Sequence, residues 1–149
     1  MSKIEEKLKK MNLELPEVPE PMGLYKPVNI YGSFLYTSGQ DSRIYKGKVG
    51  KDLTIEEGQK AAQYSALRCL ASIKKEIGDL DKIDKIFKVL GFVNCEPEFT
   101  DQPKVINGAS KLLIDLFGKS GQHARSAIGS NALPGNAAVE VEMLVTLKE

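Results

Sequence analysis

Residues 123–147, HARSAIGSNALPGNAAVEVEMLVTL, are the stretch that decides the fold. Pro134 and Gly135 lie in the middle of this stretch, and both residue types mark turns. The flanking segments alternate in the manner of half-buried strands. The stretch therefore predicts two strands joined by a turn at 133–136.

The two predicted strands carry opposite charges. Side chains alternate between the two faces of a strand, so Arg125 and Ala127 share one face of the first strand. Glu140 and Glu142 share one face of the second strand, opposite a run of apolar side chains. If the strands are neighbours, the cation and the two carboxylates are candidates to meet. We therefore expect the functional site here.

Length and composition fit one domain with a real core. The chain has 149 residues, of which 42% are hydrophobic and 28% are charged. Its net charge is +1, with acids and bases interspersed, which gives no electrostatic footprint for nucleic acid or an anionic membrane. No apolar run reaches the length of a membrane span, and the charged first residues lack a signal-peptide core. We therefore expect a cytoplasmic protein.

The sequence predicts no metal and no cofactor. Cys69 and Cys95 fit no metal-binding spacing, and no glycine-rich motif is placed to cradle a phosphate. A reducing compartment favours two buried, inert thiols, although the sequence leaves a disulfide open.

The N-terminal third predicts a helix, an extended connection and a hairpin. Ser2 and Glu5 form a capping-box pattern at the start of a short helix. Four prolines keep residues 15–27 out of regular structure. Residues 28–31 and 34–38 flank a Gly-Ser turn and predict a hairpin, after which a polar loop follows.

Two helices and a strand fill the middle of the chain. Thr54 starts a long helix, with a capping-box glutamate three residues later, and Gly78 ends it. Residues 85–94 are β-branched and aromatic enough for a strand covered on both faces, with Gly91 as a bulge or a close backbone approach. Residues 105–117 predict the second long helix.

The predicted order of these elements is β-β-α-β-α-β-β. Helices that alternate with strands, between hairpins at both ends, favour an α+β fold: a mixed sheet with two helices on one face. The other face must also be covered, and self-association is one solution. No internal repeat or domain boundary is visible.

Several blocks of the sequence resemble the Rid family, the YjgF-type reactive intermediate deaminases. The C-terminal block is Ala-Arg-Ser, Leu-Pro and Val-Glu-Val-Glu within residues 124–142. The N-terminal block is Pro-x-Gly-x-Tyr at 21–25 and Tyr-x-Ser-Gly-Gln at 36–40, and Asn107 lies near a family asparagine. Segment 91–110 is longer than its counterpart in the family, which indicates a divergent branch with a longer loop before the second helix.

The resemblance implies a chorismate-mutase-like domain, with residues 1–20 as an N-terminal extension and 21–149 as the core. Such domains form homotrimers with sites between subunits. The implied reaction is hydrolysis of 2-imino and enamine acids, such as 2-aminoacrylate, to 2-oxo acids and ammonia. It needs no cofactor, and it would make the chain a 2-iminobutanoate/2-iminopropanoate deaminase-like hydrolase.

Arg125 and Glu140 carry the implied chemistry. A guanidinium matches a carboxylate in two parallel hydrogen bonds, and Arg125 falls on the family arginine that holds the substrate. An ion pair at the surface or between subunits is the alternative. Glu140 matches the family glutamate that positions the attacking water, with a solvated carboxylate as the plain alternative. Glu142 is expected to form a structural ion pair.

Four residues are implied as further substrate contacts. Tyr25 would reach a neighbouring subunit's pocket, with a hydrophobic plug as a serious rival. Gly39 would bring its backbone close to the ligand, and backbone geometry alone also accounts for it. Asn107 would hydrogen-bond near the ligand, or cap the second helix. Ala127 stands where many bacterial members have a cysteine, but the family nucleophile is water, so its backbone remains a contact.

Two other functions stay open. The first is a non-catalytic protein that binds a small carboxylate on the same scaffold. The second is a translation inhibitor or ribonuclease, against which the near-neutral charge and the single His123 argue. By strand alternation His123 shares the Arg125 face, but a surface loop histidine is the preferred interpretation.

Overall fold

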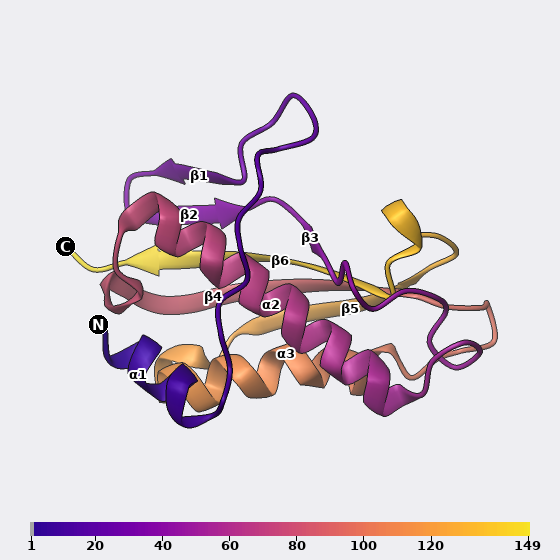
Figure 1. Ribbon diagram of the computed structural model, residues 1–149. Helices are drawn as coiled ribbons and strands as arrows, with labels where there is room; N and C mark the ends of the chain where they lie inside the picture. The colour runs from indigo at the N-terminus through magenta and orange to yellow at the C-terminus, as the bar shows by residue number, and fades with distance from the viewer. Residues whose placement is uncertain (1) are drawn as a thin grey trace.

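The computed structural model describes residues 2–149 as one six-stranded sheet with helices on one face (Figure 1). The strands are β1 (Val28–Tyr31), β2 (Phe34–Thr37), β3 (Gln40–Asp41), β4 (Ile83–Asn94), β5 (Ala124–Ser130) and β6 (Val139–Leu147). The helices are α1 (Lys3–Lys10), α2 (Ile55–Ile77) and α3 (Gln102–Phe117), with 3-10 turns η1 (Leu80–Lys82), η2 (Gly118–Gly121) and η3 (Pro134–Asn136). The predicted α+β fold is confirmed.

Side-chain caps set the boundaries of two helices where the sequence predicts them. Ser2 caps α1 and Thr54 caps α2, each by accepting a hydrogen bond from the backbone N–H three residues on. In both helices a glutamate returns the bond, which completes a capping box. The α2 helix ends at Gly78, whose φ of +87° lies in the left-handed region that favours glycine.

The core lies between the sheet and the paired helices α2 and α3. Glycine lets the two helices approach closely, because a Cβ at Gly108 would lie 2.0 Å from the carbonyl oxygen of Gln59. A Cβ at Gly91 of β4 would lie 2.5 Å from Cδ1 of Ile106 on α3. The expected close approach at Gly91 is therefore confirmed, and the bulges of β4 lie nearer its start.

The strand order corrects one expectation from the sequence: β5 and β6 are not neighbours. The sheet order is β1-β2-β6-β4-β5, so β4 lies between them. Val89 of β4 pairs with Arg125 on its parallel side and with Met143 on its antiparallel side. The turn at 134–136 does form, but a turn fixes only a reversal of the chain. The long apolar β4 takes the central position, which buries more surface than the short β5 with its small side chains.

The sheet face away from the helices exposes several large apolar side chains. Phe34 and Phe87 meet edge to face there, with ring centroids 6.3 Å apart. The large exposed side chains of the strands include Tyr31, Phe34, Tyr36, Phe87 and Ile128. Exposed aromatic and aliphatic side chains on one sheet face are typical of a surface that another protein covers. We call it the open face.

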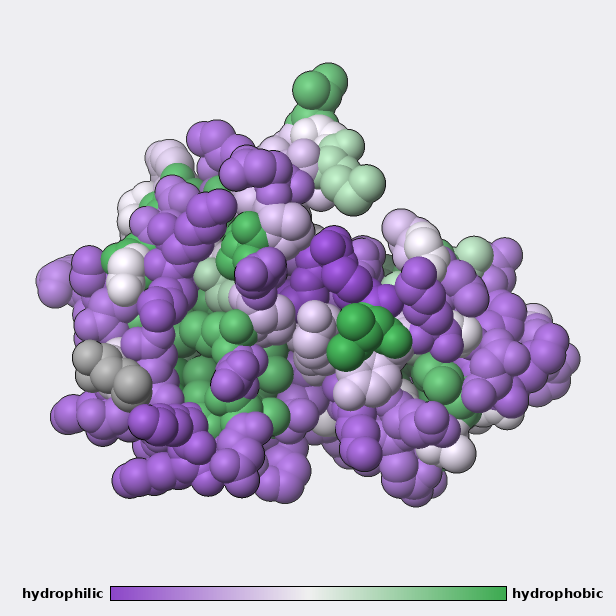
Figure 2. All heavy atoms as spheres, in the orientation of Figure 1, coloured by the Kyte–Doolittle hydropathy of each residue, from purple (hydrophilic) through white to green (hydrophobic). Residues whose placement is uncertain are grey.

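The helix side of the molecule is mostly hydrophilic (Figure 2). Its hydrophobic residues gather between α1 and α2, where Leu8, Leu13, Leu15 and Leu67 line a groove. Among residues 2–149, no helix combines the length and the apolar character that crossing a membrane requires.

Cys69 and Cys95 are both buried and free, as the sequence predicts. Burial raises the pKa of the Cys69 thiol to about 12. The thiol therefore stays protonated and inert at neutral pH.

Candidate functional site

Arg125 projects from β5 toward α3. Its NH1 group donates to Oδ1 of Asn107 at 2.8 Å and to Oγ of Ser110 at 3.2 Å. Its Nε and NH2 groups have no hydrogen-bond partner within residues 2–149. One part of the guanidinium is therefore anchored, and the remaining donors are available for a planar anion such as a carboxylate.

A histidine extends this anchor. Oγ of Ser110 lies 2.8 Å from Nε2 of His123, and Nδ1 of His123 lies 2.6 Å from the carbonyl oxygen of Gly121. Burial lowers the pKa of His123, the Gly121 carbonyl opposes that effect, and the charge of Arg125 adds to it. His123 lies in the loop before β5, as expected, but it is half-buried and hydrogen-bonded through both ring nitrogens.

Glu140 lies in a second cluster, on the opposite face of the sheet. Its neighbours Val139 and Val141 are fully buried beneath α2, so strand alternation directs Glu140 to the other side. A Cβ on Gly39 would lie 2.6 Å from Oε2 of Glu140, which explains why glycine fits there. Tyr25, Gly39 and Glu140 line one pocket of about 220 Å³.

Burial raises the pKa of Glu140 above its usual value. The nearby carboxylates of Asp41 and Glu142 raise it further, and the cation of Arg68 opposes them. A carboxylate with a raised pKa is a stronger base, so this environment suits proton transfer with water.

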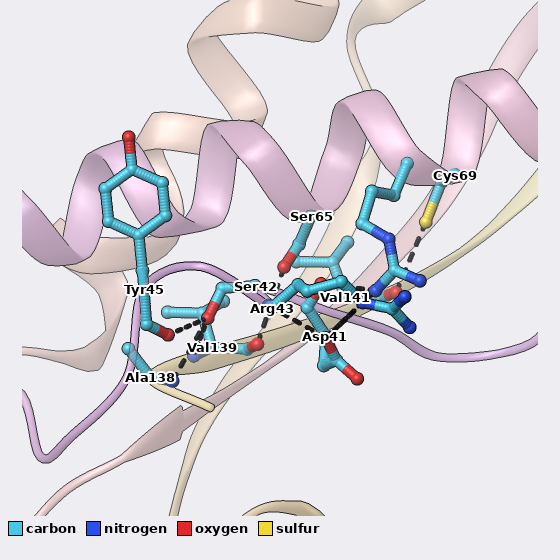
Figure 3. Close-up of polar contacts among 10 residues, drawn as sticks. Asp41, Ser42, Arg43, Tyr45, Ser65, Cys69, Ala138, Val139 and Val141 are labelled. Atoms are coloured by element: carbon cyan, nitrogen blue, oxygen red, sulfur yellow. Dashed lines mark hydrogen bonds and ion pairs between the residues drawn. The ribbon is translucent and has the colours of Figure 1, made fainter. Parts of the chain in front are cut away.

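Two cations and a serine hold β3 in place beside Glu140. The buried Arg68 donates from NH1 to the backbone oxygen of Asp41 at 2.7 Å and to its Oδ1 at 2.9 Å, and Arg43 approaches the same carboxylate at 3.9 Å. Ser42 donates to the carbonyl of Tyr45 and accepts from two backbone N–H groups at the start of β6 (Figure 3). This network ties β3 and the loop that follows it to β6 and so supports the wall next to Glu140.

The expected site residues fall into two groups that one chain does not bring together. Arg125, Asn107 and Ala127 lie together on the helix side of β5 and on α3. Tyr25, Gly39 and Glu140 line a separate pocket, to which Arg68 of α2 also contributes. The expectation that Arg125 meets the carboxylates of the next strand is wrong within a subunit, because β4 separates the strands.

Two smaller expectations also change. Asn107 lies inside α3 and accepts from Arg125, so it does not cap the helix. Glu142 forms no ion pair within residues 2–149; it lies beside the Tyr36 hydroxyl and raises the pKa of that group.

Sequence reasoning missed Ser110 and Arg68. Ser110 follows Asn107 by three residues and so shares its face of the helix, and this spacing was the available signal. Arg68 interrupts the apolar stripe of α2, and a charge in such a stripe indicates a buried partner. No group of three or more His, Cys, Asp or Glu side chains in the described part of the chain is placed to hold a metal ion.

Fold and candidate site together define a small chorismate-mutase-like α+β protein with an anchored arginine on an edge strand. The chain belongs to the family described as "YjgF/chorismate_mutase-like, putative endoribonuclease", which matches residues 5–147. TCP17 from Trypanosoma cruzi is 39% identical over 146 residues, which cover 94% of this chain and 91% of that protein.

Two solved structures are similar over nearly their whole length. Protein Atu1372 from Agrobacterium tumefaciens has a TM-score of 0.91 at 39% identity, covering 98% of this chain and 93% of its own. A Shewanella oneidensis protein called a "putative endoribonuclease" has a TM-score of 0.93 at 35% identity, and the match covers 97% of this chain and 99% of that protein.

Proposed function

We propose that this protein hydrolyses reactive 2-imino and enamine acids to 2-oxo acids and ammonia without a cofactor. One observation carries the proposal: α3 anchors NH1 of Arg125, while Nε and NH2 have no partner within residues 2–149. A guanidinium held in this way matches a carboxylate through two parallel hydrogen bonds, which a lysine cannot form.

The proposed chemistry needs only water and a base. Arg125 holds the substrate carboxylate, and Glu140 accepts a proton from a water molecule whose oxygen attacks the imine carbon. The imine nitrogen takes up a proton, which gives a carbinolamine. The C–N bond then breaks and ammonia leaves, while the hydroxyl oxygen becomes the carbonyl of the 2-oxo acid. Backbone groups at Gly39 and Ala127 are proposed further contacts.

The two groups of site residues meet in this proposal between subunits. In a homotrimer, Arg125 and Asn107 of one subunit would face Glu140, Gly39 and Tyr25 of the next. The open face supports self-association, because its exposed aromatic and aliphatic side chains favour burial. The loop at residues 21–25 also supports it, since Met22 and Leu24 are almost fully exposed and the loop extends away from the body of its own subunit (Figure 1).

A second candidate is a binding protein that retains the arginine pocket for a small carboxylate without turnover. The Nε and NH2 donors of Arg125, which have no partner within residues 2–149, also favour this candidate, because binding an anion requires no base. The ribonuclease suggested by the name of the Shewanella relative has less support. The net charge is +1, and the single histidine is pinned by Ser110 and Gly121.

Imine turnover with and without Arg125 tests the proposal. An amino-acid oxidase generates imino acids in the assay, and semicarbazide competes for them. We expect the wild type to suppress semicarbazone formation and Arg125→Ala to lose that effect. The matched control is Lys104→Ala, which removes an exposed cation from α3 and should behave as wild type.

Two results would contradict the proposal. No suppression by the wild type across several amino-acid precursors would exclude imine hydrolysis. Full suppression by Arg125→Ala would exclude the carboxylate clamp.

A further inference from the structure

The contacts around Arg125 form a chain whose directions are fixed. The Gly121 carbonyl only accepts, so Nδ1 of His123 carries the proton. In a neutral imidazole Nε2 then accepts, and the Ser110 hydroxyl must donate to it. The Ser110 oxygen is left to accept from NH1 of Arg125. Each member of the chain thus orients the next.

We propose that Ser110 and a neutral His123 are positioning residues that set the orientation of Arg125 for a substrate carboxylate. Neither residue touches the substrate in this proposal; both act through the guanidinium. The inference deepens the proposed function and rests on it for its substrate class, although carboxylate binding can be measured without turnover.

Protonation of His123 would disrupt this chain. Three elements face its imidazole: α3 with the Ser110 hydroxyl, η2 with the Gly121 carbonyl, and β5 with the charge of Arg125. A protonated Nε2 would donate to a Ser110 oxygen that already accepts from Arg125. The hydroxyl proton would lose its acceptor, and two cations would share one oxygen atom.

The neutral form is the one that the fold favours. Burial and the charge of Arg125 both lower the pKa of His123 from its usual value of 6.5. The histidine is therefore neutral at pH 7.5, and protonation enters only in acid. We expect carboxylate affinity to fall by about 3–10-fold when this one orienting hydrogen bond is lost. At an ordinary anion site acid strengthens binding, since added positive charge attracts anions, so a weaker affinity in acid distinguishes this arrangement.

The experiment is a calorimetric titration with 2-oxobutanoate, a stable 2-oxo acid, at pH 7.5 and at pH values down to 5. We expect wild-type affinity to weaken about 3–10-fold toward acid. In His123→Gln the amide oxygen still accepts from Ser110 but does not titrate, so affinity at pH 7.5 should be retained and its loss in acid abolished. Ser110→Ala should bind about 3–10-fold more weakly at pH 7.5, and Ser110→Thr should restore binding.

Controls separate positioning from folding. Ser33→Ala, in the exposed turn between β1 and β2, should bind as wild type, and the thermal midpoints of all variants should agree. Wild-type affinity in Ser110→Ala would overturn the inference, as would an unchanged acid loss in His123→Gln. Failure of the wild type to bind 2-oxobutanoate through Arg125 would overturn it as well.

The inference and the proposed function fail separately. Binding with the expected variant pattern but without imine turnover would leave positioning intact and remove only the hydrolase. Turnover whose KM and kcat are unaffected by Ser110→Ala would leave the hydrolase and remove the positioning role.

Discussion

Arg125 lies on an edge strand, yet α3 constrains its guanidinium. Asn107 and Ser110 both contact NH1, and they do so from one helix face. Because the anchor uses only NH1, the planar fork of the guanidinium is kept for a ligand. This arrangement makes the shape of the cation matter as much as its charge.

Arg125→Lys should therefore lose about 10–100-fold in imine turnover, because the charge remains but the paired donors do not. The thermal midpoint should change by no more than about 2 °C, since one partly exposed side chain is altered. Semicarbazide competition measures the first quantity and calorimetry the second. The matched control is the reverse substitution, Lys104→Arg, at an exposed position on α3. Near-normal turnover in Arg125→Lys would argue that the arginine serves only as a charge.

At neutral pH the ionised side chain of Glu140 should slightly lower the free energy of unfolding. Its pKa is raised in the folded protein, so folding favours the protonated carboxyl. The protonated carboxyl of Glu140 therefore stabilises the fold at pH values below its pKa in the unfolded chain. This stabilisation is lost as the pH rises through its pKa in the folded protein. Glu140→Gln should melt about 1–2 °C higher than wild type at pH 7, and the difference should vanish toward pH 4.

Imine turnover should fall in Glu140→Gln, although the melting temperature of this variant should rise. Loss of a general base costs on the order of 10²–10⁴-fold, whereas binding of a carboxylate ligand should be nearly unchanged. Equal losses of turnover and binding in Glu140→Gln would mark the glutamate as structural.

Helices α2 and α3 depend on one glycine for their contact. A Cβ at Gly108 would lie 2.0 Å from the backbone oxygen of Gln59, and backbone cannot rotate away as a side chain can. Since α3 carries Asn107 and Ser110, its seating on α2 and the sheet also sets the anchor of Arg125.

Gly108→Ala should destabilise the protein by about 3 kcal/mol, as overpacking does at its upper range. For a domain of this size the thermal midpoint should fall by about 6–12 °C. Lys111→Ala, on the exposed side of the same helix, removes only a surface ion pair and should change the midpoint little. A Gly108→Ala midpoint equal to that of Lys111→Ala would show that the helices separate at no cost.

Local sequence signals predicted the helices and strands themselves better than they predicted which strands pair in the sheet. Thr54 and Gly78 bound α2 because caps act within a few residues, so the sequence displays them directly. The position of β4 between β5 and β6 depends on which strands bury most together, and no local motif records that. The Asn107 contact with Arg125 is visible only after α3 is seated on the sheet.

The whole molecule presents two surfaces of different character. The helix side is mostly hydrophilic, and the open face carries aromatic and aliphatic side chains. We expect the open face to be the contact surface of the proposed homotrimer.

Ile128→Lys should shift the mass measured by sedimentation from trimer toward monomer, because Ile128 lies on the open face at 46% exposure. Imine turnover should fall in parallel as the sites between subunits separate. Ile114→Lys is the matched control: Ile114 is 41% exposed, but it lies on α3 on the helix side. A monomeric wild type with full activity would contradict the site between subunits.

The separation of Arg125 from Glu140 by β4 has a genetic consequence. In the proposed homotrimer, each catalytic centre takes its arginine and its glutamate from different polypeptides. Two inactive alleles, Arg125→Ala and Glu140→Gln, should therefore complement each other when co-expressed. With random mixing about a quarter of the interfaces would join two intact halves, so the mixed trimers would regain about that share of wild-type turnover.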